Sequence, residues 1–267
     1  MKFLITLSLL MILVSCGNKK EGDKEGTPQG SATLKISAFN VQIFGLSFMS
    51  DPAKVNELIK IIKRYDVIMI QEIRDSSETA IYDLETKLNN STTDDYAVTV
   101  STRLGRTSSK EQYAFFYKKS STALMGCIQD SDSNDYFERE PYSCRFKNKV
   151  SNRSFSLIAL HAKPDDAVNE LNALRDVWDN VASAYGDSNI IALGDFNSDC
   201  DYLSNNEFDA LDFNVGSQFT WHISKSADTT TSTTTTCAYD NFITSDAFAE
   251  NIPYAGIFNF GQEYGLS

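Results

Sequence analysis

Residues able to bind a metal ion or move a proton follow several apolar segments of this chain. Asn40, Glu72 and His161 each stand at the end of such a segment, and Asp195 and Asn197 follow another. Mg²⁺ binds oxygen ligands and keeps some of its waters, so one or two carboxylates with neighbouring amides suit it. A histidine can act beside them as a general acid or base. The pattern indicates chemistry at a hard divalent metal ion.

Each of these residues also has a purely structural interpretation. Glu72 or Asp195 can end a strand by capping a turn. His161 is one of two histidines, and a single histidine is commonly a hydrogen-bonded structural residue. The agreement of several segments within one chain, and not any single residue, favours a functional site.

The segments that carry these residues have strand-like patterns, and two helical segments separate some of them. Strands are predicted over residues 34–40, 66–72, 113–117, 155–161, 189–193 and 239–243. Apolar residues at helical spacing predict helices over 52–65 and 167–184. Because strands and helices do not alternate strictly, we predict a mixed α/β (α+β) fold of two packed sheets flanked by helices.

Composition and charge limit the class of protein. With 267 residues, 42% of them hydrophobic and 22% charged, the chain can bury one sizeable core. Its formal net charge of −12 opposes tight nonspecific binding to nucleic acid unless divalent ions and a local basic patch intervene. The threonine-rich run 229–236 is too polar for the core and is predicted to be a loop.

The first residues have the pattern of an export signal. Lys2 precedes a charge-free apolar run over residues 3–14, which is too short to span a bilayer and typical of a signal peptide. The run ends in Leu13-Val14-Ser15-Cys16-Gly17, which resembles a bacterial lipobox and implies cleavage before Cys16 and lipid on its thiol. An ordinary secretory peptide with an incidental cysteine is the alternative.

This pattern gives the expected domain boundaries. Residues 1–15 are the signal peptide, 16–32 are the lipidated Cys16 with a flexible polar tether, and 33–267 are the folded domain. We expect an exported protein of the bacterial cell envelope, held on a membrane by its lipid and either periplasmic or on the cell surface. Four cysteines remain after Cys16, and this even number predicts two disulfides in an exported protein.

Several longer blocks of the sequence resemble the deoxyribonuclease I family, a member of the endonuclease/exonuclease/phosphatase superfamily, over residues 33–267. The blocks are Ala38-Phe39-Asn40, Gln71-Glu72-Ile73-Arg74-Asp75, Lys110-Glu111-Gln112-Tyr113, Arg139-Glu140-Pro141, Ala159-Leu160-His161, Gly194-Asp195-Phe196-Asn197-Ser198-Asp199-Cys200, Ser226-Ala227-Asp228-Thr229-Thr230 and Cys237-Ala238-Tyr239-Asp240. The resemblance implies a four-layered α/β sandwich and Mg²⁺- or Mn²⁺-dependent cleavage of phosphodiester bonds in double-stranded DNA by a monomer.

The resemblance also implies a role for each site residue. His161 is the catalytic acid or base, Glu111 orients it, and Asp195 and Asp240 belong to the same catalytic group. Glu72 is the main Mg²⁺ ligand. The residues expected to hold metal-bound water or the scissile phosphate are Asn40, Asp195 and Asn197. Those expected to contact DNA are Arg74, Arg106 and Arg139, although any one arginine can equally be a solvated surface charge.

The family resemblance further implies a disulfide and a calcium site. Cys200 is expected to pair with Cys237, and Asp199, Asp228 and Thr230 match a structural Ca²⁺ site in the same loop. One extra residue before Cys237 prevents us from assigning the later threonine ligands. Cys127 and Cys144 do not have the family's spacing, and their pairing is predicted from parity alone.

Two departures from the family pattern affect the expected activity. Ser109 stands where the family has a tyrosine that packs into the minor groove, which predicts weaker or altered DNA contact. The family also continues past a segment like Tyr264-Gly265-Leu266 into a strand carrying Ser-Asp-His, whereas this sequence stops at Ser267. The absent histidine would partner Asp240, and an absent central strand would expose sheet edges. We therefore expect a truncated sequence, inactive in this form if that strand is essential.

Two other functions stay open. A phosphodiesterase or phosphatase acting on lipid or small phosphate esters would share the same fold, and the acidic net charge suits it better than DNA. A catalytically silent surface lipoprotein would keep the fold and bind a partner. The pair His161 and Glu111 argues against the silent protein, because a binding module needs no such pair.

Overall fold

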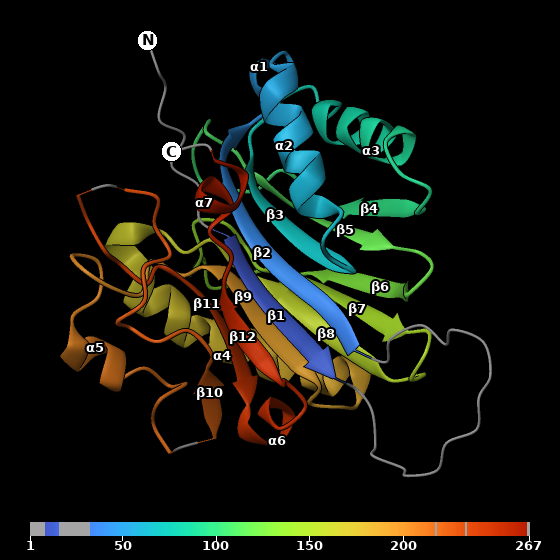
Figure 1. The fold of residues 1–267 in the computed structure, drawn as a ribbon. Coiled ribbons are helices and arrows are strands. Elements are labelled where there is room, and N and C mark those ends of the chain that lie inside the picture. The colour runs from blue at the N-terminus through green and yellow to red at the C-terminus, as the bar shows by residue number, and fades with distance from the viewer. Residues whose placement is uncertain (1–8, 16–32, 217, 233, 266–267) are drawn as a thin grey trace.

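The computed structural model describes residues 9–15, 33–216, 218–232 and 234–265. Within these residues two six-stranded mixed sheets pack face to face (Figure 1). The first sheet has the order β12-β1-β2-β3-β5-β4 and the second β10-β11-β9-β8-β7-β6. The strands of the first sheet are β1 (Leu9–Ser15), β2 (Thr33–Phe44), β3 (Val67–Ile73), β4 (Tyr96–Val100), β5 (Gln112–Lys118) and β12 (Tyr254–Ile257). Those of the second are β6 (Thr122–Gln129), β7 (Tyr142–Asn148), β8 (Ser154–Ala159), β9 (Ile190–Asp195), β10 (Phe219–Trp221) and β11 (Asp240–Ser245).

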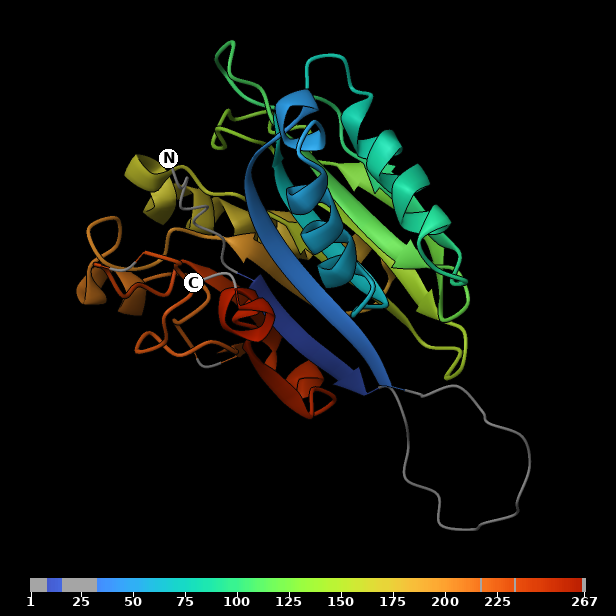
Figure 2. The same ribbon diagram turned by 45° about the horizontal axis from the view of Figure 1, so that its top comes forward.

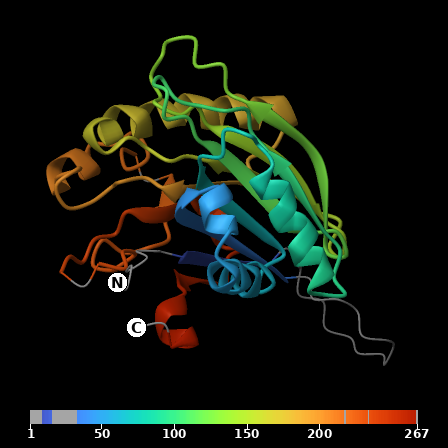
Figure 3. The same ribbon diagram turned by 90° about the horizontal axis from the view of Figure 1, so that it is seen from above.

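Helices cover the outer face of each sheet. Figures 1 and 3 show α2 and α3 outside the first sheet and α4 outside the second. The helices are α1 (Leu46–Met49), α2 (Pro52–Ile62), α3 (Ala80–Asn90), α4 (Ala167–Tyr185), α5 (Asn205–Asp209), α6 (Asp246–Ala249) and α7 (Phe260–Tyr264), and Pro164–Asp166 form a 3₁₀ turn.

Three apolar clusters separate four layers, which confirms the predicted sandwich. Leu58 and Leu84 of the helices pack on Ile70 in the first cluster. The second lies between the sheets and includes Met69 and Phe155. The third packs α4 on the second sheet. Every residue of β3 is buried, because this strand lies inside a sheet that is covered on both faces.

The two long helices begin and end with local signals in the sequence. The Asp51 side chain accepts the N–H groups of Ala53 (3.0 Å) and Lys54 (3.3 Å) and so caps the first turn of α2. This helix ends at Ile62, three residues before the end of the predicted range 52–65. The helix predicted over 167–184 is α4, and Gly186 ends it in the left-handed conformation with φ 67°.

Two pairs of neighbouring strands are parallel and bring the ends of four strands to one edge of the sandwich. β2 runs parallel to β3 with Asn40 opposite Gln71, and β8 runs parallel to β9. β11 is antiparallel to β9 and places Asp240 opposite Asp195. Glu72, His161 and Asp195 stand at or just after the ends of β3, β8 and β9, while Asn40 lies within β2 and Asp240 begins β11, so the topology gathers them.

β1 is an interior strand, and it lies within the predicted signal peptide. It is antiparallel to both neighbours, with Leu10 opposite Ala38 of β2 and opposite Ile257 of β12 (Figure 2). β2 therefore has a strand on each side. The signal peptide and the domain boundaries stay predictions, and Cys16 with the tether lies outside the described residues. Across the described residues we found no helix both long and apolar enough to cross a membrane.

Candidate active site

A buried histidine–glutamate pair lies at the centre of the site. His161 follows β8 and Glu111 precedes β5, and Nδ1 of His161 lies 2.9 Å from Oε2 of Glu111. Both residues are buried, with exposed fractions of 6% and 3%. Tyr113 fixes the histidine backbone because its hydroxyl accepts the His161 N–H at 2.8 Å. The two sheets therefore each supply one member of the pair.

The electrostatics of Glu111 fix the tautomer of His161. Burial raises the pKa of Glu111, but the hydrogen bond and charge of His161 and the charges of Arg139 and Arg74 outweigh burial and lower it to about 2. An ionised carboxylate can only accept hydrogen bonds. Nδ1 of His161 therefore carries the proton, and Nε2 is the nitrogen that can take one from a reacting group.

Two of the three predicted DNA-contacting arginines surround this pair. The Arg74 Nη2 lies 2.7 Å from Oε1 of Glu111 and 3.4 Å from Oε2 of Glu72. Arg139 donates from Nε to the His161 carbonyl at 3.0 Å and from Nη1 to Glu111 at 3.5 Å. The Arg74 side chain is one-third exposed. It can therefore meet an anionic substrate while it stays tied to Glu111.

The third arginine lies apart from this group. Arg106 is in the loop before β5, and its guanidinium forms an ion pair with Asp135 at 2.8 Å. Its backbone N–H donates to Glu138 at 3.2 Å. Ser109 is exposed in the same loop. The structure therefore connects Arg106 to the segment before Arg139 and not to the histidine pair.

A second cluster joins two carboxylates through one amide. Nδ2 of Asn40 donates to Oε1 of Glu72 and to Oδ2 of Asp195, each at 3.1 Å. The backbone N–H of Ile43 donates to the other oxygen of Glu72 at 3.1 Å. Gln71 accepts the backbone N–H of Asp195 at 3.3 Å. The carboxylates of Glu72 and Asp195 thus lie on either side of one amide nitrogen.

Unusual backbone conformations direct the side chains of this cluster. Glu72 has φ 60° and Asn197 has φ 47°, a left-handed region that residues other than glycine rarely occupy. Ile43 also has φ 63°, which is more costly for a β-branched residue. Such strain is commonly found at functional sites and persists because the surroundings hold it.

Asn197 and Asp240 complete the edge of the site. The Asn197 side chain donates to the Ala162 carbonyl at 2.8 Å, and its backbone N–H donates to Asp195 at 3.1 Å. Asp240 is 2% exposed, and its N–H donates to the Thr229 hydroxyl at 3.1 Å. These bonds connect the segment after β8 with the segment after β9, and the start of β11 with Thr229.

The donor set of the second cluster fits a small divalent cation. Two carboxylates, Glu72 and Asp195, lie on either side of the Asn40 side chain, and carboxylate oxygens suit Mg²⁺ or Mn²⁺. Within the described part of the chain, no three acidic, histidine or cysteine side chains converge on one point. An ion here would therefore complete its shell with water, as Mg²⁺ commonly does.

The structure contains both predicted disulfides. Cys200 pairs with Cys237 and Cys127 with Cys144. The second pair joins directly opposite residues of β6 and β7, so the parity argument gave the right partners.

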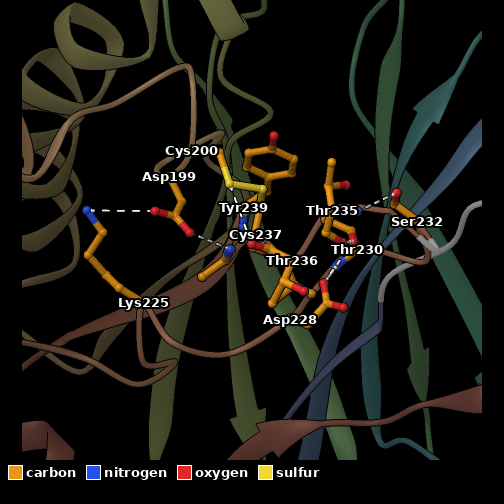
Figure 4. Close-up of a disulfide and its surroundings, with 12 residues drawn as sticks. Asp199, Cys200, Lys225, Asp228, Thr230, Ser232, Thr235, Thr236, Cys237 and Tyr239 are labelled. Atoms are coloured by element: carbon orange, nitrogen blue, oxygen red, sulfur yellow. Dashed lines mark hydrogen bonds and ion pairs between the residues drawn. A yellow bond between two sulfur atoms is a disulfide. The ribbon is translucent and has the colours of Figure 1, made fainter.

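The three predicted calcium ligands lie in two groups beside the Cys200–Cys237 disulfide. Figure 4 shows Asp199 on one side of it, facing Lys225, and Asp228 with Thr230 on the other. Asp199 accepts the Ala238 N–H at 2.9 Å. Asp228 accepts both the N–H and the hydroxyl of Thr230, at 3.0 and 2.8 Å. The oxygens of Asp228 and Thr230 suit Ca²⁺, but Asp199 does not share their position.

Sequence reasoning did not identify three supporting residues of the site. Gln71 and Tyr113 lie inside the blocks that carry the family resemblance, and their position directly beside Glu72 and two residues after Glu111 was the available signal. Glu170 is an acidic residue on the apolar face of α4, a position that helical spacing alone assigns to the core.

The second histidine has a different environment. Nε2 of His222 lies 2.8 Å from the Thr244 hydroxyl, and burial lowers its pKa to about 4. His222 is therefore neutral at physiological pH and bonds within the second sheet, away from the Glu111–His161 pair.

Comparison with known proteins identifies the family. The sequence profile of the Endonuclease/Exonuclease/phosphatase family matches residues 37–248. The chain is 36% identical to deoxyribonuclease-1 of Bos taurus over 251 residues, which cover 91% of this chain and 89% of the bovine protein. It is 38% identical to deoxyribonuclease-1 of Homo sapiens over 248 residues, covering 90% and 88% of the two chains.

Solved structures agree on the fold. An endonuclease/exonuclease/phosphatase family protein from Bacteroides thetaiotaomicron superposes with a TM-score of 0.57 at 15% identity, covering 80% of this chain and 83% of its own. A mannosyl-6-phosphatase of the same species gives 0.56 at 14% identity, covering 80% and 86%. With this fold, the gathered site residues and the extended identity to deoxyribonuclease-1, the chain belongs to the deoxyribonuclease I group of the endonuclease/exonuclease/phosphatase family.

Proposed function

We propose that this protein is a metal-dependent endonuclease that hydrolyses phosphodiester bonds of double-stranded DNA. The observation that carries the proposal is the Glu111–His161 pair, which Arg74 connects to the carboxylate of Glu72. The proposal is supported by 36–38% identity to deoxyribonuclease-1 over about nine-tenths of the chain.

The residues of the two clusters divide the chemistry between them. Arg74 and Arg139 offset the charge of a phosphate diester and of its transition state. Glu111 holds the imidazole of His161 so that Nε2 faces the reacting group and exchanges a proton with it. The residues that would hold Mg²⁺ or Mn²⁺ are Glu72, Asn40, Asp195 and Asn197. When bound, such an ion would supply Lewis acidity at the phosphate and would lower the pKa of a water.

Calcium, export and membrane attachment are further proposals. Ca²⁺ is assigned to Asp228 and Thr230. The two disulfides support export, because they persist in oxidising compartments. Lipid at Cys16 would hold a monomer on a membrane of a bacterial cell envelope. Mass spectrometry of the N-terminal peptide of the processed protein tests the lipid, since acylation adds a defined mass to a peptide that begins at Cys16.

Metal dependence and substrate class are tested by incubating the folded domain with supercoiled plasmid and, separately, with a small phosphate monoester. We expect nicking with Mg²⁺ that EDTA abolishes, and no comparable release of phosphate from the monoester. Because the resemblance includes a Ser-Asp-His segment after residues like 264–266, the same assay is run with the chain extended by the reading frame that follows Ser267. Release of phosphate without nicking, in both forms, would replace the nuclease by a phosphatase.

A further inference from the structure

A fully buried acid lies behind the histidine pair. Glu170 is in the first turn of α4, three residues after Ala167 and four before Leu174, on the face that packs against the second sheet. Its exposed fraction is 0%. Burying a carboxyl group is costly unless hydrogen bonds or charges compensate, so the partners of Glu170 explain why it can be there.

The partner of Glu170 is a backbone group beside the active site. Its Oε1 accepts the N–H of Glu138 at 3.0 Å. Glu138 directly precedes Arg139. Glu170 therefore joins the segment that carries Arg139 to α4, the helix that follows the His161 segment.

The segment that carries Arg139 also contacts the catalytic pair. Arg139 donates to the His161 carbonyl at 3.0 Å and contacts Glu111 at 3.5 Å. The carboxylate of Glu138 accepts the backbone N–H of Arg106 at 3.2 Å. A shift of the 138–139 backbone would therefore move Arg139 relative to both His161 and Glu111.

The ionisation of Glu170 agrees with a role in holding backbone. Burial raises its pKa to about 7, although the N–H of Glu138 and the charge of Arg139 oppose this rise. Within the described residues its Oε2 is buried without a hydrogen-bond partner. The N–H of Glu138 is therefore the hydrogen bond that offsets the cost of burying this carboxyl group.

We propose that Glu170 is a positioning residue whose carboxylate holds the 138–139 backbone on α4 and thereby holds Arg139 against His161 and Glu111. Its importance for catalysis rests on the endonuclease function proposed above. The geometry of the Glu111–His161 pair depends on Glu170 whether or not DNA is the substrate.

Two substitutions of Glu170 distinguish the effect of side-chain length from the effect of charge. Glu170→Gln keeps the length of the side chain and one acceptor oxygen but removes the charge. Glu170→Asp keeps the charge but is shorter by one methylene, so it cannot reach the Glu138 N–H from the same helix position. Asp179→Asn is the matched control, because Asp179 is an exposed acid of the same helix and forms an ion pair with Arg175 of that helix.

The two histidines allow a readout that needs no substrate. Ring resonances in NMR spectra report His161 and His222 separately, and His222 bonds to Thr244 outside this network. We expect Glu170→Asp to shift the His161 resonances clearly and Glu170→Gln to shift them less, while those of His222 stay in place. In plasmid nicking we expect Glu170→Asp to lower kcat tenfold or more with KM within about threefold, Glu170→Gln to lower it less, and Asp179→Asn to match the parent chain.

Several outcomes would overturn the proposal. If folded Glu170→Asp has the His161 resonances of the parent chain, or if His161 and His222 shift together, Glu170 only stabilises the fold. A larger shift of the His161 resonances in Glu170→Gln than in Glu170→Asp would show that the charge of Glu170 matters and its length does not, which also contradicts the proposal. If the Asp variant does not fold, a Gln variant with unshifted His161 also overturns it. A parent chain that does not cut DNA refutes the proposed function alone, because the spectra still test the positioning role.

Discussion

Gly194 lies where the ends of β3, β8 and β9 meet, and its replacement by alanine tests how closely these ends pack. It has φ 141°, and an added Cβ would lie 2.1 Å from the carbonyl oxygen of Leu160 and 2.9 Å from Oε1 of Gln71. The first contact is with backbone, so no side-chain rotation relieves it. Leu160, Gln71 and Gly194 directly precede the site residues His161, Glu72 and Asp195, so the clash would displace the active site.

The expected cost of Gly194→Ala is the sum of two effects. Backbone strain contributes about 1–3 kcal/mol and overpacking about 1–3 kcal/mol, so the free energy of unfolding should fall by about 2–6 kcal/mol. For a domain of this size, about 2–4 °C is lost per kcal/mol, which gives a decrease in Tm of roughly 5–20 °C. We also expect plasmid nicking to fall by about 10²-fold or more, as displacement of positioned groups does.

A second glycine separates the clash from the strain. Gly186 has φ 67°, and no atom lies within 4 Å of an added Cβ, so Gly186→Ala should cost only about 1–2 kcal/mol of left-handed strain and leave activity unchanged. The measurements are thermal unfolding by circular dichroism and nicking of supercoiled plasmid. Equal Tm values for the two variants, or full activity of Gly194→Ala, would refute the close packing of these strand ends.

Three further predictions concern pH, disulfides and β1. The pKa of Glu111 is lowered to about 2 in the folded protein, so its stabilising contribution is complete above its unfolded pKa and is lost as pH falls from about 4.5 to 2, at most about 3 kcal/mol. Glu111→Gln should therefore flatten the dependence of Tm on pH in that range, and an equally steep curve would contradict this. Serine in place of Cys200 and Cys237, which are 37 residues apart, should lower the free energy of unfolding by about 4 kcal/mol, against about 3 kcal/mol for Cys127 and Cys144, which are 17 apart. Denaturant titration of the two double variants measures both losses, and a larger loss for the Cys127 and Cys144 variant would contradict the prediction. Removal of residues 1–15, which cleavage before Cys16 would also remove, deletes β1 and leaves β2 and β12 with unpaired edges, so the shorter chain should have a lower Tm; an unchanged Tm would show that the folded domain does not depend on β1.

The site was largely predictable because its residues end buried strands. The apolar runs before Glu72, His161 and Asp195 form β3, β8 and β9, and each run is apolar because helices and a second sheet cover it on both faces. The order of strands and the parallel pairs were not predictable in this way. They depend on contacts between segments far apart in sequence, which local pattern does not encode.

Other elements were missed for specific physical reasons. β7 contains Arg145 and Lys147 between apolar residues, so its pattern is weaker than that of a fully buried strand. Residues 9–15, which form β1, stay part of the predicted signal peptide, because an apolar run of this length fits an export signal and a buried strand equally well. Glu170 was missed because the position of an acid on a helix does not reveal the backbone groups of other segments that it binds.

The central claim is that His161, held by Glu111, carries out proton transfer in DNA cleavage. The most direct test compares His161→Gln with His222→Gln in Mg²⁺-dependent nicking of supercoiled plasmid, in a form of the protein that is active before substitution. Loss of a general acid or base lowers the rate by about 10²–10⁴-fold. We predict that loss for His161→Gln and near-normal nicking for His222→Gln; nicking by folded His161→Gln at the parent rate would contradict the account.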